Sequence, residues 1–374
     1  MTNIKLGDLC KSCAGQIKVE DGELIDYIDI SSIDNEKKKL IGFQTMPFGE
    51  SPSRARKVVK KGSILVSTVR PNLNAIAVLE NDTPNISVAS TGFCILDCKD
   101  DVDNRFVFNF CKSRKFIDDM VSKATGASYP AVSDKIIRSA LVPNYTYEEQ
   151  CNISKVLDSI SDIIDKREAE LFSLDELIKA RFVEMFGDPI INSFGWKIVN
   201  ISEVVGGKVS NGFFSKRDDY CDDGNVSVLG VANIVNRMYS KVDELPKTNA
   251  DLKDIEKYEV KYGDMLFCRS SLVAEGIGKA SIVPEGVHDR VLFECHVIRL
   301  PLDLDKCVPE FMQTLSTMDF FRNQVIAQSK TATMTTIGQD GILKSNIILP
   351  PIEKQREFYD FIKQVDKSKF MKFF

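Results

Sequence analysis

The residues of this chain best suited to chemistry are cationic and hydroxyl side chains that could contact phosphate groups. The most concentrated basic run places Arg54, Arg56, Lys57, Lys60 and Lys61 within eight residues, with no acidic residue among them. Lysine and arginine neutralise phosphates and supply much of the affinity of proteins for nucleic acids. A solvated surface run would have the same composition, so these residues by themselves leave both interpretations open.

Two short loops combine small hydroxyl residues with one lysine. They are residues 123–128 (KATGAS) and 329–333 (SKTAT), each just before the last apolar strand of its half of the chain. Hydroxyl groups and lysine suit close approach to phosphate oxygens, but a plain polar turn is equally compatible with them. The candidate binding residues in these loops are Lys123, Thr125, Ser128, Lys330, Thr331 and Thr333.

Catalytic patterns are sparse in this sequence. The two histidines, His288 and His296, both lie in the second half of the chain, and no glycine-rich phosphate loop, HExxH or GxSxG motif is present. The single CxxC, Cys10 to Cys13, lacks a second pair at zinc spacing and is interpreted as structural. We therefore predict no catalytic residue, no metal and no cofactor, because a stand-alone enzyme would need a site that we do not find.

The chain repeats itself at a nearly constant offset. Residues 61–67 (KGSILVS) return as 262–268 (YGDMLFC), and residues 92–96 (GFCIL) return as 296–300 (HVIRL). Val142-Pro143 matches Leu349-Pro350, and Gln150 matches Gln355. A period near 200 residues is too long for a solenoid, so the sequence predicts a duplicated domain that binds two similar things.

Each half reads as a mixture of strands and helices. Apolar, β-branched runs predict strands at 64–69 and 76–79, with counterparts at 265–269 and 280–283. Helical spacing predicts one helix from 106 to 121 and another from 309 to 325, with Pro309 in the first turn. The expected fold class is α+β, with two similar mixed α/β domains.

A long amphipathic helix is predicted between the two halves. No proline or glycine falls between Glu148 and Phe186, and at ~1.5 Å per residue a helix over residues 148–185 spans roughly 57 Å. A second helix follows the second half and repeats the spacing at offset 205. Both stripes keep a heptad register, so we predict an antiparallel coiled coil with pseudo-two-fold symmetry. The apolar positions are Ile153, Leu157, Ile160, Ile164, Leu171, Leu174 and Ile178, and then Phe358, Ile362 and Val365.

The predicted organisation has five parts. The second spacer helix is short, because the counterpart of residues 170–186 is missing. The parts are a first domain (1–147), a central spacer helix (148–186), a linker (187–195), a second domain (196–350) and a short C-terminal spacer helix (351–374).

Composition limits the class of protein. The chain has 374 residues, 43% of them hydrophobic, and a net charge of -5, which counts against a nucleic-acid partner. No segment approaches the 18 or more apolar residues of a membrane span, and the N-terminus does not read as a secretory signal. We therefore expect a cytoplasmic protein with no membrane contact.

The ordered set of domain, heptad helix, domain and heptad helix resembles the specificity subunit of type I restriction–modification systems over essentially the whole chain. The resemblance is carried by residues 61–70 (KGSILVSTVR) with their second copy, by Val142-Pro143 and Gln150, by residues 349–355 (LPPIEKQ), and by the junction at 186–196. It implies that each domain is a target recognition domain reading one half of a bipartite double-stranded DNA sequence. The paired helices would set the gap between the halves.

The same resemblance implies partners. Two DNA adenine methyltransferase subunits would dock on one non-catalytic specificity subunit, and restriction subunits would complete the nuclease. Arg70 and Arg269, each after the matching strand, are the best candidates to face the DNA, with the run from Arg54 to Lys61 as a backbone contact. The alternative is a protein-assembly scaffold that uses the paired helices without touching DNA. The overall acidity favours the scaffold, and the basic run and repeated motifs disfavour it.

Overall fold

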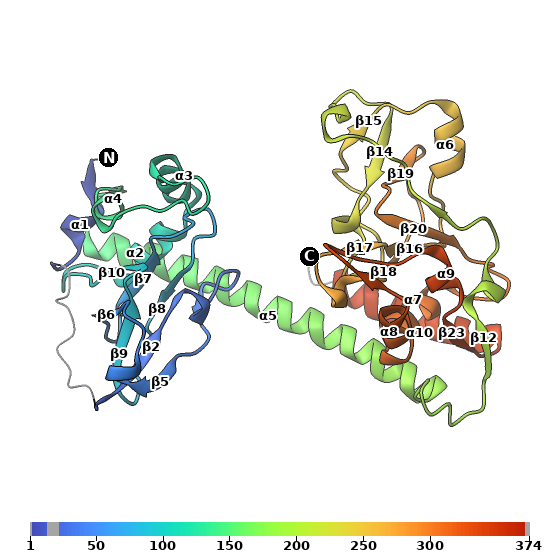
Figure 1. The fold of residues 1–374 in the computed structure, drawn as a ribbon, viewed down its shortest axis with the longest axis horizontal. Helices are drawn as coiled ribbons and strands as arrows, with labels where there is room; N and C mark the ends of the chain where they lie inside the picture. The colour runs from blue at the N-terminus through green and yellow to red at the C-terminus, as the bar shows by residue number, and fades with distance from the viewer. Residues whose placement is uncertain (1, 13–21, 371–374) are drawn as a thin grey trace. The chain divides into compact units, whose positions relative to one another are not determined.

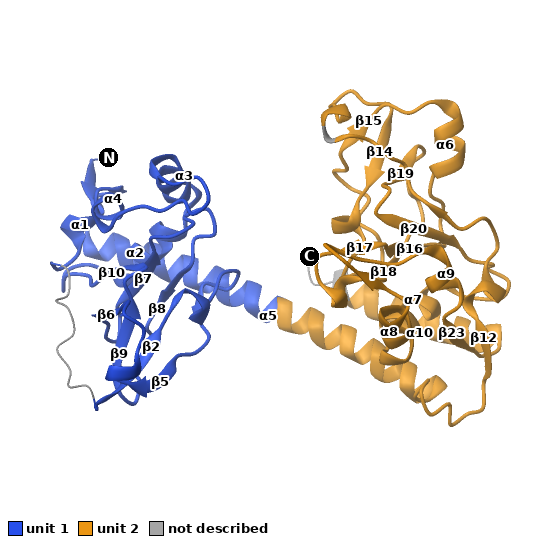
Figure 2. Cartoon of the chain, in the orientation of Figure 1, with its two compact units in different colours: residues 1–167 blue, residues 168–374 orange. Residues whose placement is uncertain are grey.

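The computed structural model describes residues 2–12 and 22–370. The chain forms two compact units, residues 1–167 and 168–374 (Figures 1 and 2), and each is described by itself below. The boundary between them falls inside α5 (Tyr147–Phe186), the long helix drawn in green in Figure 1. Within the described residues, no helix combines the length and apolarity needed to cross a membrane.

Unit 1 contains two main sheets. One has the order β5-β2-β9-β6, in which β2 and β9 are parallel, and the other has the antiparallel order β10-β7-β8. The strands are β1 (Asn3–Lys5), β2 (Leu24–Ile28), β3 (Ile33–Asp34), β4 (Lys39–Leu40), β5 (Gln44–Pro47), β6 (Ala55–Val58), β7 (Ile64–Ser67), β8 (Ile76–Val78), β9 (Ile86–Ser90), β10 (Phe93–Leu96) and β11 (Leu141–Pro143).

Residues 64–66 of strand β7 are all apolar because both faces of the strand are buried. Ile64 and Val66 pack into one core cluster with the helices, whereas Leu65 packs into a second cluster with residues of the other sheet. A strand covered on both faces reads as a continuous apolar run, which is why the sequence signal was strong here. The helices of this unit before α5 are α1 (Leu6–Leu9), α2 (Asn104–Lys112), α3 (Arg114–Lys123) and α4 (Asp134–Arg138).

Unit 2 repeats this plan with additions. Strands β13-β20-β16-β18 form the sheet that corresponds to β10-β7-β8, and β14 pairs in parallel with β19 as β2 does with β9. The strands are β12 (Lys197–Asn200), β13 (Ser210–Asn211), β14 (Val226–Leu229), β15 (Lys247–Thr248), β16 (Asp264–Cys268), β17 (Ser270–Ser271), β18 (Ala280–Ile282), β19 (Val291–Phe293), β20 (Val297–Pro301), β21 (Lys330–Thr331), β22 (Thr335–Thr336) and β23 (Asn346–Leu349); the helices are α6 (Leu252–Tyr258), α7 (Pro309–Thr317), α8 (Asp319–Ala327), α9 (Gln339–Leu343) and α10 (Ile352–Phe370).

The prediction of one helix in each half before the final strand was wrong, because each is broken into two. In unit 1 the break is at Ser113, whose backbone is extended (φ -66°, ψ 145°) and whose hydroxyl caps α3 by accepting a hydrogen bond from the Phe116 N–H. Met318 has the same extended conformation between α7 and α8. The apolar spacing continues across a one-residue break, so periodicity alone could not reveal it.

The internal repeat extends to individual hydrogen bonds. The buried side chain of Gln150 accepts from the Asp103 N–H at 3.1 Å and donates to the Tyr145 carbonyl at 2.9 Å. Gln355 makes the equivalent bonds, from the Val308 N–H at 2.9 Å and to the Pro350 carbonyl at 2.8 Å. All three pairs of positions differ by 205 residues, so each glutamine fastens its spacer helix to its own unit in the same way.

The first turns of α5 are fixed to unit 1. Ile153 packs against its core, and the buried Ser154 hydroxyl contacts the Asp103 carboxylate at 3.2 Å. Further along, Lys39 pairs with Asp165 at 2.7 Å. Between Ser154 and Asp165 the predicted stripe is exposed: the exposed fractions of Leu157, Ile160 and Ile164 are 39%, 48% and 52%.

The last turns of α5 belong to the core of unit 2. Ile178 is buried there with Leu174 packed against it, and Phe358, Ile362 and Val365 of α10 join the same cluster. Phe358 contacts the rings of Phe182 and Phe186 at 5.5 and 5.6 Å between centroids. The start of α10 therefore packs against the end of α5, through two phenylalanines that the heptad prediction did not include.

The junction after α5 explains the motif at residues 186–196. Gly187 takes a left-handed conformation (φ 76°), and a Cβ atom there would lie 2.8 Å from the Ser193 hydroxyl. The Trp196 indole then donates to the Phe186 carbonyl at 2.8 Å. Gly187 ends the helix, and the Trp196 indole stabilises the turn that follows by bonding the Phe186 carbonyl, which has no partner within the helix.

Candidate nucleic-acid interface

In unit 1 the end of β7 and the hydroxyl loop of residues 123–128 form one surface feature. The Arg70 N–H donates to the Pro130 carbonyl at 2.7 Å, and the Val132 N–H donates to the Thr68 carbonyl at 2.8 Å. Two segments more than 50 residues apart in sequence are therefore bonded side by side. We call the exposed residues Arg70, Thr125, Ser128 and Tyr129 the first loop cluster.

Arg70 is held over an aromatic ring in this cluster. Its backbone is left-handed (φ 48°), and its guanidinium carbon lies 4.5 Å from the centroid of the Tyr129 ring, which is 66% exposed. In the described part of the chain no carboxylate lies within ion-pair distance of Arg70. An exposed guanidinium supported by a tyrosine and free of acidic partners can hydrogen-bond a phosphate or a base edge.

Gly126 makes the turn of this loop possible. Its φ is 103°, and a Cβ atom there would lie 2.7 Å from the Tyr129 carbonyl oxygen. The tight turn brings Thr125 opposite Ala131, with hydrogen bonds in both directions at 3.0 and 2.9 Å. Glycine is therefore required for the loop that presents Tyr129 to Arg70.

In unit 2 the corresponding segments also meet. The Ile337 N–H donates to the Arg269 carbonyl at 3.0 Å, and β17 pairs with β22, which pairs with β21. The His296 ring lies 3.1 Å from the Ser270 hydroxyl. We call Arg269, Ser270, His296, Lys330, Thr331 and Thr333 the second loop cluster; all but the first two are exposed.

Arg70 and Arg269 do not occupy equivalent positions. The Thr68 N–H donates to the Gly92 carbonyl at 2.8 Å, and the Arg269 N–H donates to the His296 carbonyl, also at 2.8 Å. Gly92 and His296 are matched positions of the repeat, so Thr68 is the counterpart of Arg269 and Arg70 is the counterpart of Ser271. Both arginines lie at the expected end of the matching strand, but they are two residues apart in the register of the repeat.

The basic run does not form one phosphate-binding surface. Arg54 is exposed, and Arg56 is half-buried with its guanidinium 5.6 Å from the Phe48 ring centroid. Lys57 is engaged inside the unit, where its ammonium contacts Asp134 at 2.7 Å and the Phe93 carbonyl at 2.6 Å. A register shift between Ala55 and Lys57 marks a β-bulge, and such bulges re-aim side chains.

Lys60 and Lys61 are exposed but lie at the other end of β7 from Arg70. The four-residue strand alone spans about 13 Å, so these lysines and the first loop cluster are separate surfaces. They line an open cavity of about 330 Å³ that also holds Asp97, Asp100 and Asp103. Lys123 pairs with Asp119 at 2.7 Å on its own helix, which leaves Arg70 as the cation of the first loop cluster without an acidic partner in the described residues.

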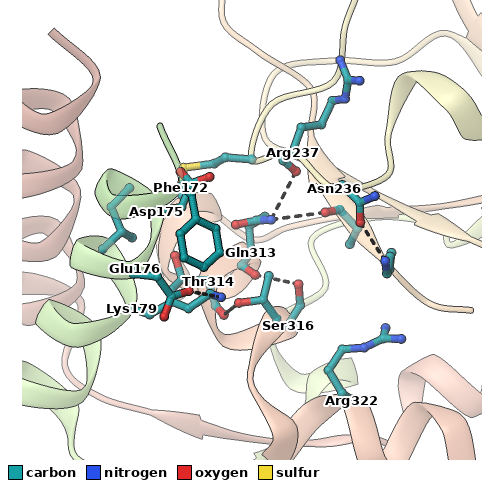
Figure 3. A pocket seen from close by; sticks show the side chains of 15 residues that line it. Phe172, Asp175, Glu176, Lys179, Asn236, Arg237, Gln313, Thr314, Ser316 and Arg322 are labelled. Carbon is teal, nitrogen blue, oxygen red and sulfur yellow. Dashed lines mark hydrogen bonds and ion pairs between the residues drawn. The ribbon is translucent and has the colours of Figure 1, made fainter. Parts of the chain in front are cut away.

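A cavity with a volume of about 520 Å³ lies in unit 2 (Figure 3). Residues of α5 including Phe172 form one wall, and α7 forms another. Its polar groups largely bond to one another: the Gln313 amide donates to the Arg237 and Ala280 carbonyls at 3.3 Å, and Lys279 donates to Asn236 at 2.7 Å. Its lining residues contain no nucleophile paired with a base.

Across residues 2–12 and 22–370 no group of three or more His, Cys, Asp or Glu side chains is placed to hold a metal ion. Of the CxxC, Cys13 lies outside the described residues.

The sequence reasoning missed three residues of the loop clusters, which are Tyr129, Ser270 and His296. Tyr129 is an aromatic residue in a loop of small residues, and this could have marked it as a contact residue. His296 was noted only as a poor catalytic candidate, although it replaces Gly92 of the first half beside the loop. Neither the contact of Tyr129 with Arg70 nor the contact of His296 with Ser270 could be read from spacing, because each depends on how the loop folds back.

The chain is similar to known proteins of one family. The type I restriction modification DNA specificity domain matches residues 194–372. The specificity subunit of the type I restriction enzyme MjaVIII of Methanocaldococcus jannaschii is 22% identical over 279 residues, which cover 71% of this chain and 64% of that protein. The HindI specificity subunit of Haemophilus influenzae is 23% identical over 189 residues, 49% of this chain and 40% of that protein. The chain thus spans less than two thirds of the length of either relative.

A solved structure shows the same fold. The crystal structure of the type I restriction–modification S subunit from M. genitalium aligns with 98% of this chain and 90% of its own, at a TM-score of 0.52 and 12% identity. This likeness shows the fold, and the family match assigns residues 194–372 of unit 2 to the type I DNA specificity domain. The resemblance to type I specificity subunits predicted from the motifs is confirmed.

Proposed function

We propose that this chain is a non-catalytic subunit that recognises a bipartite sequence in double-stranded DNA and directs adenine methyltransferase subunits to it. In this proposal the target recognition domains are residues 1–147 and 196–350, each reading one half of the target. The observation that carries the proposal is the Arg70–Tyr129 pair, an exposed guanidinium positioned beside a hydroxyl loop and held 4.5 Å from an aromatic ring.

The two loop clusters support DNA contact because they offer complementary groups. Arginine can donate two hydrogen bonds to the O6 and N7 atoms of guanine, and threonine, serine and lysine contact phosphates. The second loop cluster has an exposed Lys330 with Thr331 and Thr333 in the corresponding place. Arg54, Lys60 and Lys61 are then secondary backbone contacts, and Lys57 is a structural residue held by Asp134.

The spacer helices support assembly with protein partners. Leu157, Ile160 and Ile164 of α5 present an exposed apolar stripe, and a stripe of this kind is normally covered. We propose that α5 and α10 pair as an antiparallel coiled coil, and that two methyltransferase subunits bind along it, with restriction subunits completing a nuclease. Contacts of Phe358 with Phe182 and Phe186 support the antiparallel direction, as does the cation–π contact of Arg181 with Phe361.

The second candidate is an assembly scaffold that does not bind DNA. The exposed stripe of α5 and the net charge of -5 favour it. It assigns no role to the Arg70–Tyr129 pair, which is why we prefer DNA recognition.

The test is DNA binding by the full chain together with its methyltransferase subunits. Sequencing of methylated adenines first defines the target, and fluorescence anisotropy then measures affinity for that duplex and for a scrambled one. We expect a two-part motif and affinity that falls steeply with salt, because phosphate contacts release counterions. Stable assembly with methyltransferase but equal, weak binding to both duplexes would favour the scaffold.

A further inference from the structure

Cys10 and Cys98 face each other across an antiparallel backbone pair in unit 1. The Lys11 N–H donates to the Asp97 carbonyl at 2.7 Å, and the Lys99 N–H donates to the Leu9 carbonyl at 3.0 Å. These bonds flank the two cysteines, which are therefore a non-hydrogen-bonded pair. Opposed residues of this kind have Cα atoms about 4.5 Å apart and close side chains, within the range of about 4.4–6.8 Å that a disulfide requires.

The two thiols already interact in the reduced protein. The hydrogen bond from the Cys98 thiol lowers the pKa of Cys10, and the positive charge of Arg138 acts in the same direction. The same hydrogen bond raises the pKa of Cys98. Arg138 is fixed beside the pair by donating to the Ile95 carbonyl at 2.9 Å and the Lys11 carbonyl at 3.1 Å. Loss of one proton thus leaves a thiolate that the neighbouring thiol stabilises, and the thiolate is the reactive form of cysteine.

Small oxidants can reach this pair from solvent. Cys10 is buried, but Cys98 is half-buried and lines the open cavity of about 330 Å³ with Lys11, Lys60 and Lys99. Cys111, in contrast, is fully buried and its pKa is raised by that burial. Accessibility and a cross-strand partner therefore distinguish Cys10 and Cys98 from their buried neighbour.

We propose that Cys10 and Cys98 form an oxidisable dithiol site that hydrogen peroxide converts into an intramolecular disulfide. The thiolate of the pair attacks one peroxide oxygen, the O–O bond breaks, and the departing hydroxide takes a proton to become water. The second sulfur attacks the resulting sulfenic acid, a sulfur–sulfur bond forms, and hydroxide leaves with the remaining thiol proton as a second water. The two sulfurs lose two electrons, which reduce the peroxide.

The disulfide would join the segment after α1 to the segment after β10 and close a chain loop from residue 10 to residue 98. Cross-links that close long loops restrict the unfolded chain and so stabilise the fold. We expect the oxidised chain to melt about 5 °C or more above the reduced chain.

The experiment uses the full, reduced chain treated with hydrogen peroxide and then with N-ethylmaleimide. Non-reducing peptide mass spectrometry is expected to find the Cys10 and Cys98 peptides joined, with the loss of two hydrogens. Cys98→Ser and Cys10→Ser should each abolish the cross-link and the rise in Tm. Cys151→Ser is the matched control, because Cys151 is also half-buried in unit 1, and this variant should keep both.

Three results would overturn the proposal. They are a Cys10–Cys13 disulfide in place of Cys10–Cys98, both cysteines recovered as maleimide adducts after peroxide treatment, or a Cys98→Ser variant that still shows the rise in Tm. Because Cys98 is partly exposed, its serine variant is expected to fold, and the unoxidised variant provides the baseline for that measurement.

Discussion

The two units share a backbone framework and differ in the side chains of their loop clusters. Thr68 and Arg269 occupy the same backbone position, as do Gln150 and Gln355. At the loop clusters, unit 1 places an arginine over a tyrosine, whereas unit 2 places a histidine and serine beside an arginine whose guanidinium donates to the Cys295 carbonyl at 3.2 Å. The backbone bonds that position the loops are preserved, and the side chains that would contact DNA are not.

This difference is the one expected of a DNA-binding protein whose two domains recognise different half-sequences. A rigid frame can hold the loops at fixed positions while the loop side chains vary, because the frame depends on buried backbone and core contacts that the loops do not supply. The comparison also shows that the spacer helices are attached by equivalent hydrogen bonds but by unequal packing, which gives the following tests.

The largest expected effect is a difference in stability cost between equivalent positions on the two spacer helices. Phe358→Ala should destabilise unit 2 by about 3–5 kcal/mol, because it empties a fully buried site against Phe182 and Phe186. The sole tryptophan, Trp196, lies in unit 2, so its fluorescence during urea unfolding reports this unit. Ile153→Ala is the matched change, and because Ile153 is only partly buried it should cost about 1–2 kcal/mol when measured by circular dichroism. Equal costs would contradict the unequal packing.

Removal of the paired glutamines should have similar effects in the two units. Gln150→Ala and Gln355→Ala each leave a backbone N–H and a carbonyl without their partner, part-buried in unit 1 and buried in unit 2, at a cost of about 2 kcal/mol. Hydrogen exchange at the N-termini of α5 and α10 would measure local opening. Glu149→Ala and Lys354→Ala, at nearby exposed positions, serve as controls. A large effect in only one unit would show that the two glutamines do not have equivalent roles.

The loop clusters should respond separately. Arg70→Ala should weaken binding to the cognate duplex about tenfold, within the range of about 1–3 kcal/mol for a bidentate base contact, and relax the sequence preference in one half of the target. Tyr129→Phe, which keeps the ring under Arg70, should have little effect. Arg269→Ala should affect the other half and do so less, because Arg269 is already bonded to a carbonyl. Anisotropy titrations and methylated-adenine sequencing measure both, and unchanged motifs in all three variants would remove these residues from the interface.

The smallest effects are expected in the pH dependence of stability, with opposite signs in the two units. In unit 2 burial raises the pKa of Glu310 and of Asp264. A carboxyl whose pKa is raised on folding favours the folded state at low pH, so unit 2 should gain stability as pH falls through these raised pKa values. Trp196 fluorescence melts should show this trend, and Glu310→Gln should flatten it.

In unit 1 the pKa of the buried Asp26 carboxyl is shifted in the opposite direction. Burial alone would raise the pKa of Asp26, but hydrogen bonds from Thr45 and Asn85 outweigh it and the pKa is lowered. The ionised Asp26 carboxylate therefore stabilises the fold fully above the ordinary pKa of aspartate, and this stabilisation is lost as pH falls through the lowered pKa. Asp26→Asn should remove that loss in acid unfolding followed by circular dichroism, and a wild-type unit 1 that becomes more stable in acid would contradict the assignment.

Much of the framework could be predicted because it depends on local patterns. Residues 64–66 and 265–268 lie on strands that are buried on both faces, so they are apolar without interruption. The helix of residues 147–186 has no proline or glycine and keeps one apolar spacing. The breaks at Ser113 and Met318 escaped prediction because a single extended residue leaves the apolar period almost unchanged.

By itself, the sequence determined the class of fold, the duplication, the long helix and the family resemblance, since each is written as a periodic or repeated signal. Only the tertiary structure decided that Lys57 is tied to Asp134, that Arg269 corresponds to Thr68, and that Arg70 stands over Tyr129. These relations join residues far apart in the chain. Their physical cause is the backbone bonding that brings a strand end and a distant loop together, which residue types and spacing do not encode directly.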